Sequence, residues 1–221
     1  HQYDVFSHTI EAFKKADSII KGRYHLGISP SFSVTDQLTI KYAALFHDLG
    51  KPFSKTQNGN DVHFFGHETV SADIAQQIMD RLRFAREEKK RIVKLIKHHM
   101  RFLSLFLSDP KEKTLRKFVY TLGEDTEAII CLAFADLIAH KEVVCNQRLE
   151  RFKALSHSVL EIYTQGDVTR LKPIIRGKDL LDLGYKEGSK VGEILRVLLD
   201  MQIAGEITTK EDALKVIKER F

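Results

Sequence analysis

Apolar residues recur three or four positions apart through most of this chain, which is the spacing of helices that bury one face. The first such stretch predicts a helix from about Asp4 to Lys21. A second predicts a helix from about Asp36 to Leu49, which Gly50 and Pro52 end. Further helices are expected from about residue 67 onward, and at about 86–101, 110–122, 125–140 and 146–164.

Beyond Pro173 the chain changes to shorter helical segments. Thr208 and Glu211 have the spacing of a capping box in front of the last segment. The predicted segments are 178–183, 189–203 and 209–220.

The fold class follows from what the pattern contains and lacks. Residues 55–66 are polar, with a turn predicted at Asn58-Gly59, and no stretch of useful length alternates like a strand. No glycine-rich phosphate loop is found either. We therefore expect an all-α fold in two parts, a helical bundle over residues 1–165 and a small helical tail over residues 166–221.

Composition excludes some classes of protein. No apolar run reaches the ~18 residues of a membrane span, since the longest, residues 128–139, is too short and contains Asp136. Cys131 and Cys145 are the only cysteines, too few for a disulfide framework, so we expect a cytoplasmic protein that does not enter membranes. The net charge of +5 is mild evidence for anionic partners.

Much of the positive charge lies between Arg81 and Arg101. The simpler interpretation is one solvated helix face, and a groove for RNA is the alternative.

The stretch from Ile129 to Ala139 is apolar on nearly every side of its predicted helix, which is typical of a buried helix. Asp136 is its one charge. A buried carboxylate needs a cationic partner, so we favour a metal ion, with an arginine or a neighbouring helix end as the alternative.

His47 and Asp48 stand side by side just before Gly50 and Pro52. Adjacent helical residues point about 100° apart, so both can reach one ion only near the end of a helix. The pair alone is equally compatible with a core histidine and a residue near the helix C-terminus.

Other imidazoles lie near the buried sides of separate helices. His99 continues the apolar face of its helix and His98 lies one step round; His8 is near the start of the first helix, and His67 begins the third beside Glu68. Imidazole and carboxylate donors suit Mn, Fe, Ni, Zn or Mg, and the lack of thiolate donors argues against a structural zinc knot.

These residues together carry a resemblance. The chain resembles the HD superfamily of metal-dependent phosphohydrolases over about residues 4–140, through the ordered set His8, His47-Asp48 within HDLGK, His67-Glu68, His99 and Asp136. Within it, the chain is similar to the HD-containing C-terminal half of bacterial tRNA nucleotidyltransferases, the CCA-adding and poly(A) polymerase group. The similar segments are VFSHT, AALFHDLGKP, HFFGHE followed by SA, a helix ending in HHM, and in the tail RGKDLLDLGYKEG and VGEILRVLLDMQIAGEITTKEDAL.

The transferase head of that group, with its Gly-Gly turn and paired aspartates, is not found in these 221 residues. We therefore expect that this chain alone does not add nucleotides. Because the sequence starts at His1, a head would precede that residue if the chain is part of a longer protein.

The resemblance implies roles for individual residues. It implies that His8, His47, Asp48 and Asp136 hold a first ion. A second ion would be held by His67 and His99, with Asp48 bridging and His98 as the alternative to His99.

Substrate and proton-transfer roles follow from the same resemblance. It implies catalytic roles for Asp48 and Lys51, with Lys51 and Arg101 meeting substrate phosphate and Glu68 as a proton-transfer candidate. Four histidines match no motif position and are interpreted as surface or loop residues: His25, His63, His140 and His157.

The predicted function is hydrolysis of phosphomonoesters or phosphodiesters of nucleotides or RNA ends, such as 2′,3′-cyclic phosphates, with one or two divalent metal ions as cofactors. The alternatives are a non-catalytic tRNA-binding body and tail of a nucleotidyltransferase, and a signalling-nucleotide phosphodiesterase or nucleotide triphosphohydrolase. Phosphate release from a substrate panel separates the two hydrolase readings, whereas salt-dependent tRNA binding without turnover indicates the non-catalytic one.

Overall fold

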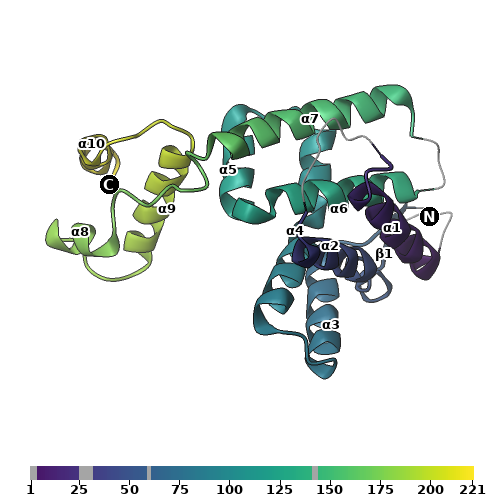
Figure 1. Ribbon diagram of the computed structural model, residues 1–221. Helices are drawn as coiled ribbons and strands as arrows, with labels where there is room; N and C mark the ends of the chain where they lie inside the picture. The colour runs from purple at the N-terminus through teal and green to yellow at the C-terminus, as the bar shows by residue number, and fades with distance from the viewer. Residues whose placement is uncertain (1–3, 25–31, 59–60, 141–143) are drawn as a thin grey trace. The chain divides into compact units, whose positions relative to one another are not determined.

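The structure is a computed structural model that describes residues 4–24, 32–58, 61–140 and 144–221. These residues are predominantly α-helical, which confirms the predicted all-α class (Figure 1). His25, His1 and the second half of the predicted Asn58-Gly59 turn lie outside the described residues. None of the helices described is both long enough and apolar enough to cross a membrane.

The chain forms two compact units, residues 1–109 with 125–157, and residues 110–124 with 158–221. This partition assigns residues 110–124 to the second unit, and the division after residue 165 into an HD domain and a tail stays a prediction. The first unit contains α1 (Val5–Ile20), α2 (Val34–Phe46), η1 (Lys51–Phe53), β1 (Thr56–Asn58), β2 (Asp61–His63), α3 (His67–Arg81), α4 (Arg86–Leu107), α6 (Thr126–Ala139) and the start of α7 (Asn146–Gln165). The second contains α5 (Glu112–Leu122), the end of α7, α8 (Gly177–Asp182), α9 (Ser189–Ile203) and α10 (Lys210–Arg220); η2 (Gly123–Asp125) falls on the boundary.

Helix α6 is the centre of the first unit. It packs against α1, α2 and α4 (Figure 1). Twelve of its residues are buried, including Asp136. Cys131 is fully buried, and burial raises the pKa of its thiol to about 12. The buried helix predicted from its uniformly apolar sequence is confirmed.

Local chemistry sets the ends of α2. Its first turn carries a capping box in which Ser33 and Asp36 exchange hydrogen bonds, so the helix begins two residues before the predicted start. The helix ends at Phe46, three residues earlier than predicted. The backbone N–H of His47 still donates to the carbonyl of Ala43 at 2.9 Å, so the His-Asp pair directly follows the last turn.

Helix α4 is longer than predicted. Its buried face continues past His99 through Phe102 and Phe106, whose rings lie 5.0 and 5.6 Å from the ring of Phe152. The predicted end at Arg101 was wrong because the apolar repeat continues for two more turns, supported by α7.

One further expectation was wrong. Residues 55–66 contain the antiparallel pair β1–β2, with Thr56 opposite His63, whose three-residue strands are too short to show alternation in the sequence. Asp125 precedes α6 without capping it by its side chain. Its buried carboxylate accepts hydrogen bonds from Arg91 Nε and Lys94 Nζ, each at 2.9 Å, so part of the basic run on α4 is internally paired.

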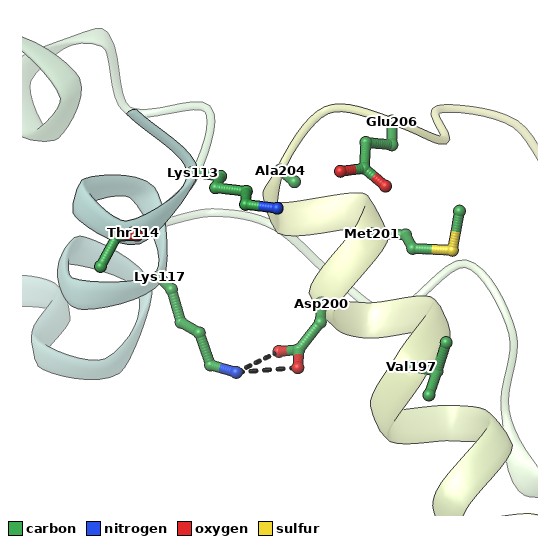
Figure 2. A pocket seen from close by; sticks show the side chains of 8 residues that line it. All are labelled: Lys113, Thr114, Lys117, Val197, Asp200, Met201, Ala204 and Glu206. Carbon is green, nitrogen blue, oxygen red and sulfur yellow. Dashed lines mark hydrogen bonds and ion pairs between the residues drawn. The ribbon is translucent and has the colours of Figure 1, made fainter. Parts of the chain in front are cut away.

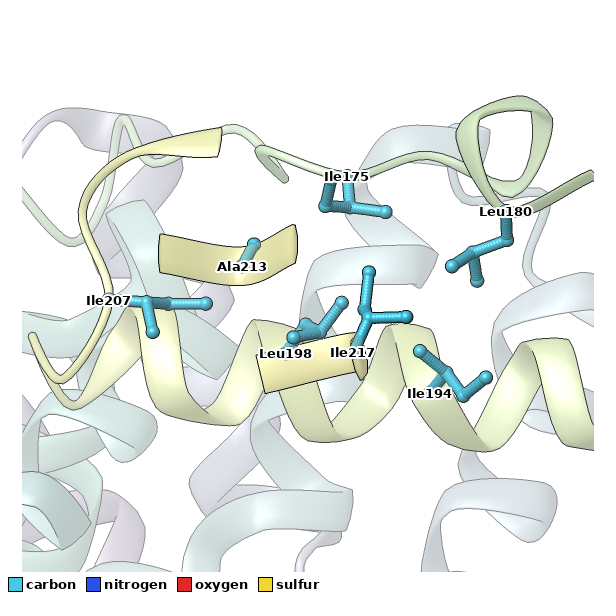
Figure 3. Packing of buried hydrophobic residues seen from close by; sticks show 7 residues of the cluster. All are labelled: Ile175, Leu180, Ile194, Leu198, Ile207, Ala213 and Ile217. Atoms are coloured by element: carbon cyan, nitrogen blue, oxygen red, sulfur yellow. The ribbon is translucent and has the colours of Figure 1, made fainter. Parts of the chain in front are cut away.

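The second unit has its own apolar core. The side chains of α8, α9 and α10 meet with those of the connecting segments (Figure 3). The cluster consists of Ile175, Leu180, Ile194, Leu198, Ile207, Ala213 and Ile217. The last helix is capped by Thr209 and Asp212, one residue beyond the predicted Thr208 and Glu211, because Asp212 N–H donates to Thr209 Oγ1 at 3.1 Å.

Helices α5 and α9 of the second unit line a cavity of about 360 Å³ (Figure 2). Lys117 of α5 pairs with Asp200 of α9 across it, at 2.7 Å. Arg116 donates to the carbonyl of Ile203 at 2.6 Å. The cavity contains none of the histidines singled out in the sequence.

Candidate metal centre

Five helices or helix ends bring imidazole and carboxylate groups to one buried place in the first unit. The residues are His8 of α1, His47 and Asp48 just after α2, His67 at the start of α3, His99 of α4 and Asp136 of α6, each 6% exposed or less. These are the positions that the sequence nominated, and the fold gathers them although they are up to 128 residues apart.

Three of the imidazoles are oriented by the same local contact. The Nδ1 atoms of His47, His67 and His99 lie 2.9, 2.8 and 2.7 Å from the carbonyl oxygens of Ala44, Phe64 and Ile96, three residues earlier. A carbonyl oxygen only accepts, so each Nδ1 carries the proton and donates it. In the neutral form of each ring, Nε2 therefore offers a lone pair to the centre, the arrangement typical of metal-ligating histidines.

The Nε2 atoms of His67 and His99 lie 3.2 Å apart. With both Nδ1 protons donated to the backbone, two lone pairs would face each other at this distance. Such a contact is repulsive unless a proton or a cation lies between the two nitrogens.

The carboxylates complete the cluster. Asp136 Oδ1 lies 2.9 Å from His8 Nε2 and 3.6 Å from His47 Nε2. Asp48 lies between His8 and His67, with Oδ2 3.5 Å from His8 Nε2 and Oδ1 3.4 Å from His67 Nε2.

Two buried polar atoms of the cluster, His47 Nε2 and Asp48 Oδ1, have no hydrogen-bond partner. Leaving such atoms unsatisfied is costly, whereas a metal ion would satisfy both. Donor atoms of His8, His47 and Asp48 lie within 4.8 Å of one another, as do those of Asp48, His67 and His99. The residues therefore fit one or two divalent ions.

Electrostatics favour the ligating forms of Asp48, Asp136 and His99, whereas His47 must lose a proton before it can ligate. Burial opposes ionisation of Asp48 and Asp136, but His47 and the other histidines outweigh it and hold both carboxyl pKa values below the ordinary range. Burial lowers the pKa of His99 to about 4, so this ring is neutral. Burial also opposes the charged form of His47, but Asp48 and Asp136 raise its pKa to about 10; a metal ion would displace that proton.

Gly50 holds the His-Asp turn against the start of α3. Its N–H donates to Ser71 Oγ at 2.8 Å. A Cβ at this position would overlap the carbonyl oxygen of His67 and lie 2.6 Å from the backbone nitrogen of Ser71. This close approach, which requires glycine, keeps Asp48 beside His67.

Two residues predicted to meet substrate or transfer protons, Lys51 and Glu68, lie beside the cluster. Lys51 Nζ donates to Asp48 Oδ2 at 2.6 Å and lies 5.9 Å from the centroid of the Phe64 ring. Glu68 is about one-third exposed, with Oε2 3.6 Å from His67 Nδ1.

His98 lies outside the groups of potential ligands found among the described residues. His98 is half-buried on the basic side of α4, where burial and the charges of Arg101, Lys94 and Lys97 lower its pKa. Consecutive helical residues point about 100° apart, so His99 reaches the centre and His98 does not.

The structure brings in one residue that the sequence reading assigned to the surface. His140 Nε2 lies 3.9 Å from Asp136 Oδ1, and its ring centroid lies 4.8 Å from that of His8. Its spacing of four residues after Asp136 on a helix was the available signal. His63 instead stacks on Phe65 at 5.1 Å, and His157 is exposed on α7.

Comparison with protein-family models matches residues 5–139 to the HD domain. The chain belongs to the HD domain family. HD domains form a superfamily of metal-dependent phosphohydrolases, and the potential ligands from His8 to Asp136 lie within the matched residues.

Two curated proteins are similar to more than the HD domain alone. A CC-adding tRNA nucleotidyltransferase of Thermus thermophilus is 32% identical over 182 residues, 80% of this chain and 38% of that protein. An A-adding tRNA nucleotidyltransferase of Deinococcus radiodurans is 28% identical over 218 residues, 96% of this chain and 46% of that protein. The chain thus spans less than half the length of these relatives.

Proposed function

We propose that this chain is an HD-type metal-dependent phosphohydrolase that cleaves phosphomonoesters or phosphodiesters of nucleotides or RNA ends, for example 2′,3′-cyclic phosphates. One observation carries the proposal. Three imidazoles donate Nδ1–H to backbone carbonyls, so their Nε2 atoms face the same buried place as the carboxylates of Asp48 and Asp136.

The donor set divides into two overlapping groups. His8, His47, Asp48 and Asp136 would hold a first ion, and Asp48 with His67 and His99 a second. Nitrogen and oxygen donors without thiolates suit Mn, Fe, Ni, Zn or Mg. When bound, such an ion makes water a better nucleophile and offsets charge on a phosphate oxygen.

The chain's own residues would bind and orient the substrate. The Lys51 ammonium group, held by Asp48, offers a cation for a phosphate oxygen beside the cluster. Glu68 is accessible enough to exchange protons with solvent while remaining next to His67. Phe53 and Phe65, 75% and 79% exposed, flank these residues in the sequence and could stack on a nucleobase, which supports a nucleotide substrate.

Metal content comes before activity in the test. Elemental mass spectrometry on untagged protein, purified without chelator, should find one or two transition-metal ions per chain. Asp48→Asn should lose them, and Asp73→Asn, which changes an exposed carboxylate of α3, should keep them. Protein that takes up no Mn or Ni after loading would contradict the proposal.

The metal-loaded protein should then release phosphate, or open a cyclic phosphate, from at least one member of a panel. The panel contains 2′,3′-cyclic nucleotides, 2′- and 3′-nucleotides, RNA with cyclic ends, signalling cyclic dinucleotides and nucleoside triphosphates. Preference for the last two classes would support the phosphodiesterase or triphosphohydrolase reading. Loaded protein inert on the whole panel would exclude hydrolysis of these substrates.

A second candidate function is tRNA binding without catalysis. It is supported by the similarity to two tRNA nucleotidyltransferases over 80% and 96% of this chain and by the net charge of +5. Binding of tRNA measured from low to moderate salt should weaken steeply if phosphates are contacted. Salt-dependent binding by metal-loaded protein that turns over no substrate would favour this candidate.

A further inference from the structure

His140 lies at the rim of the metal cluster, immediately after the end of α6. It is the C-cap residue of that helix, in the extended backbone region (φ −68°, ψ 145°). Its side chain is 45% exposed, whereas those of His8 and Asp136 are 6% and 8% exposed. This imidazole therefore lies between solvent and two buried potential ligands.

We propose that His140 is a further metal ligand, which binds the ion held by His8 and Asp136 from the solvent side. The proposal rests on the proposed function, because it requires that the cluster holds a divalent ion. It assigns a residue outside the His-Asp pattern that marked the site in the sequence.

The geometry that supports this role is specific. One donor atom each from His8, Asp136 and His140 lie within 4.8 Å of one another. His140 Nε2 is 3.9 Å from Asp136 Oδ1, too far for a hydrogen bond but close enough for both atoms to reach one ion. The separation of four residues places both side chains on the same face of the last turn of α6.

The orientation of His8 supports the same role. Its Nε2 already lies 2.9 Å from Asp136 Oδ1, and its ring is tilted 31° from that of His140. Both rings thus approach the same carboxylate oxygen from neighbouring positions.

This role has a consequence for the order of metal binding. The first ion would have His140 in addition to His8, His47, Asp48 and Asp136, whereas the second would have Asp48, His67 and His99. We expect the first site to fill at lower metal concentration. Because His140 is the most exposed donor, it is also the one that substrate or water could replace.

The test is a titration of the metal-free full chain with Co²⁺ alone, followed by its visible absorption bands and by calorimetry. His140→Gln should weaken binding at the tighter site about tenfold and change the shape of its absorption bands. His140→Glu, which supplies a carboxylate oxygen as ligand in place of the imidazole nitrogen, should recover part of the affinity. His157→Gln, which removes an exposed histidine of α7, should behave as the native protein.

His8→Gln provides the reference for loss of the site, and circular dichroism checks that each variant is folded. If His8→Gln loses the tighter site while His140→Gln keeps native affinity and absorption, the role of His140 is excluded and the proposed function stands. If the native protein binds no Co²⁺, the proposed function fails and the role of His140 with it.

Discussion

At the scale of single residues, the site depends on which ring nitrogen of each histidine faces the centre. In His47, His67 and His99 the carbonyl three residues earlier accepts a hydrogen bond from Nδ1–H, so the helix or turn that carries each ring leaves Nε2 to face the centre. As a result, the Nε2 atoms of His67 and His99 lie 3.2 Å apart, and the buried Nε2 of His47 has no hydrogen-bond partner. Local backbone contacts thus create a centre that a cation stabilises.

At the same scale, Gly50→Ala should destabilise the first unit and weaken metal binding. The added methyl group would lie 2.6 Å from the backbone nitrogen of Ser71, so the turn carrying Asp48 must move away from His67. We expect a loss of about 1–3 kcal/mol in the free energy of unfolding, measured by urea denaturation.

The control for this substitution is Gly192→Ala within α9, where a Cβ would meet nothing within 4 Å. It should stabilise its helix by roughly 0.5–1 kcal/mol. Native stability and native metal content in Gly50→Ala would show that the close approach at Gly50 is not needed.

At the scale of elements, ion pairs and aromatic contacts connect the helices that carry the ligands. Arg91 of α4 binds Asp36 of α2 at 2.8 Å and also Asp125, which Lys94 contacts too. Phe152 of α7 contacts Phe106 of α4 and Phe134 of α6, with ring centroids 5.6 and 5.2 Å apart. These contacts hold α2, α4 and α6 in register, which in turn positions His47, His99 and Asp136.

The Asp36 pairing predicts a pH dependence of stability. Burial opposes ionisation of Asp36, but Ser33 and Arg91 outweigh it and lower its pKa below 3.8. A folded-state pKa below the unfolded value contributes stability above the unfolded pKa, and that contribution is lost as pH falls through the folded pKa.

Asp36→Asn should therefore be less stable than the native protein near pH 6, and the difference should shrink as pH falls below about 4. Chemical denaturation across this range measures both curves, with the exposed Asp73→Asn as control. A difference that is constant with pH would show that the Asp36 charge contributes nothing to stability.

Phe152→Ala should be among the most destabilising substitutions in the first unit. The ring is fully buried and lies against three other phenylalanines, so its removal leaves a cavity. We expect a loss of about 3–5 kcal/mol in the free energy of unfolding. Leu107→Ala, at a residue 72% exposed at the end of α4, should change stability by less than about 0.5 kcal/mol.

At the scale of the whole molecule, each of the two compact units has its own buried core. The metal cluster belongs to the first unit alone, since all its donors lie within residues 1–109 and 125–157. Ion binding should therefore stabilise the first unit and leave the second unaffected. This separation makes the thermal unfolding of the whole chain informative.

Adding a divalent ion to chelator-treated protein should raise the apparent melting temperature of the first unit. An ion present at 100 times its dissociation constant contributes about 2.7 kcal/mol to the stability of the state that binds it. Calorimetry with and without Mn²⁺ measures the shift, and Asp48→Asn should abolish it. Equal shifts in native protein and variant would indicate that the ion binds elsewhere.

Much of this protein follows from local sequence pattern. Helical periodicity predicts most helices to within a few residues, and the uniformly apolar stretch around Asp136 identifies the central helix, because both depend on neighbouring residues. The order of the His and Asp residues along the sequence likewise predicted the site. The strands β1 and β2 were not predicted, because three residues are too few to show the alternation of a strand.

Only the tertiary structure decided which side chains converge. His8 and Asp136 meet across 128 residues, His99 reaches the centre while His98 faces the basic side, and His140 joins the rim. Asp125 likewise finds its partners on α4, 31 and 34 residues away. A sequence pattern specifies the face of a helix, but distances between faces depend on how the helices pack, and ligation depends on those distances.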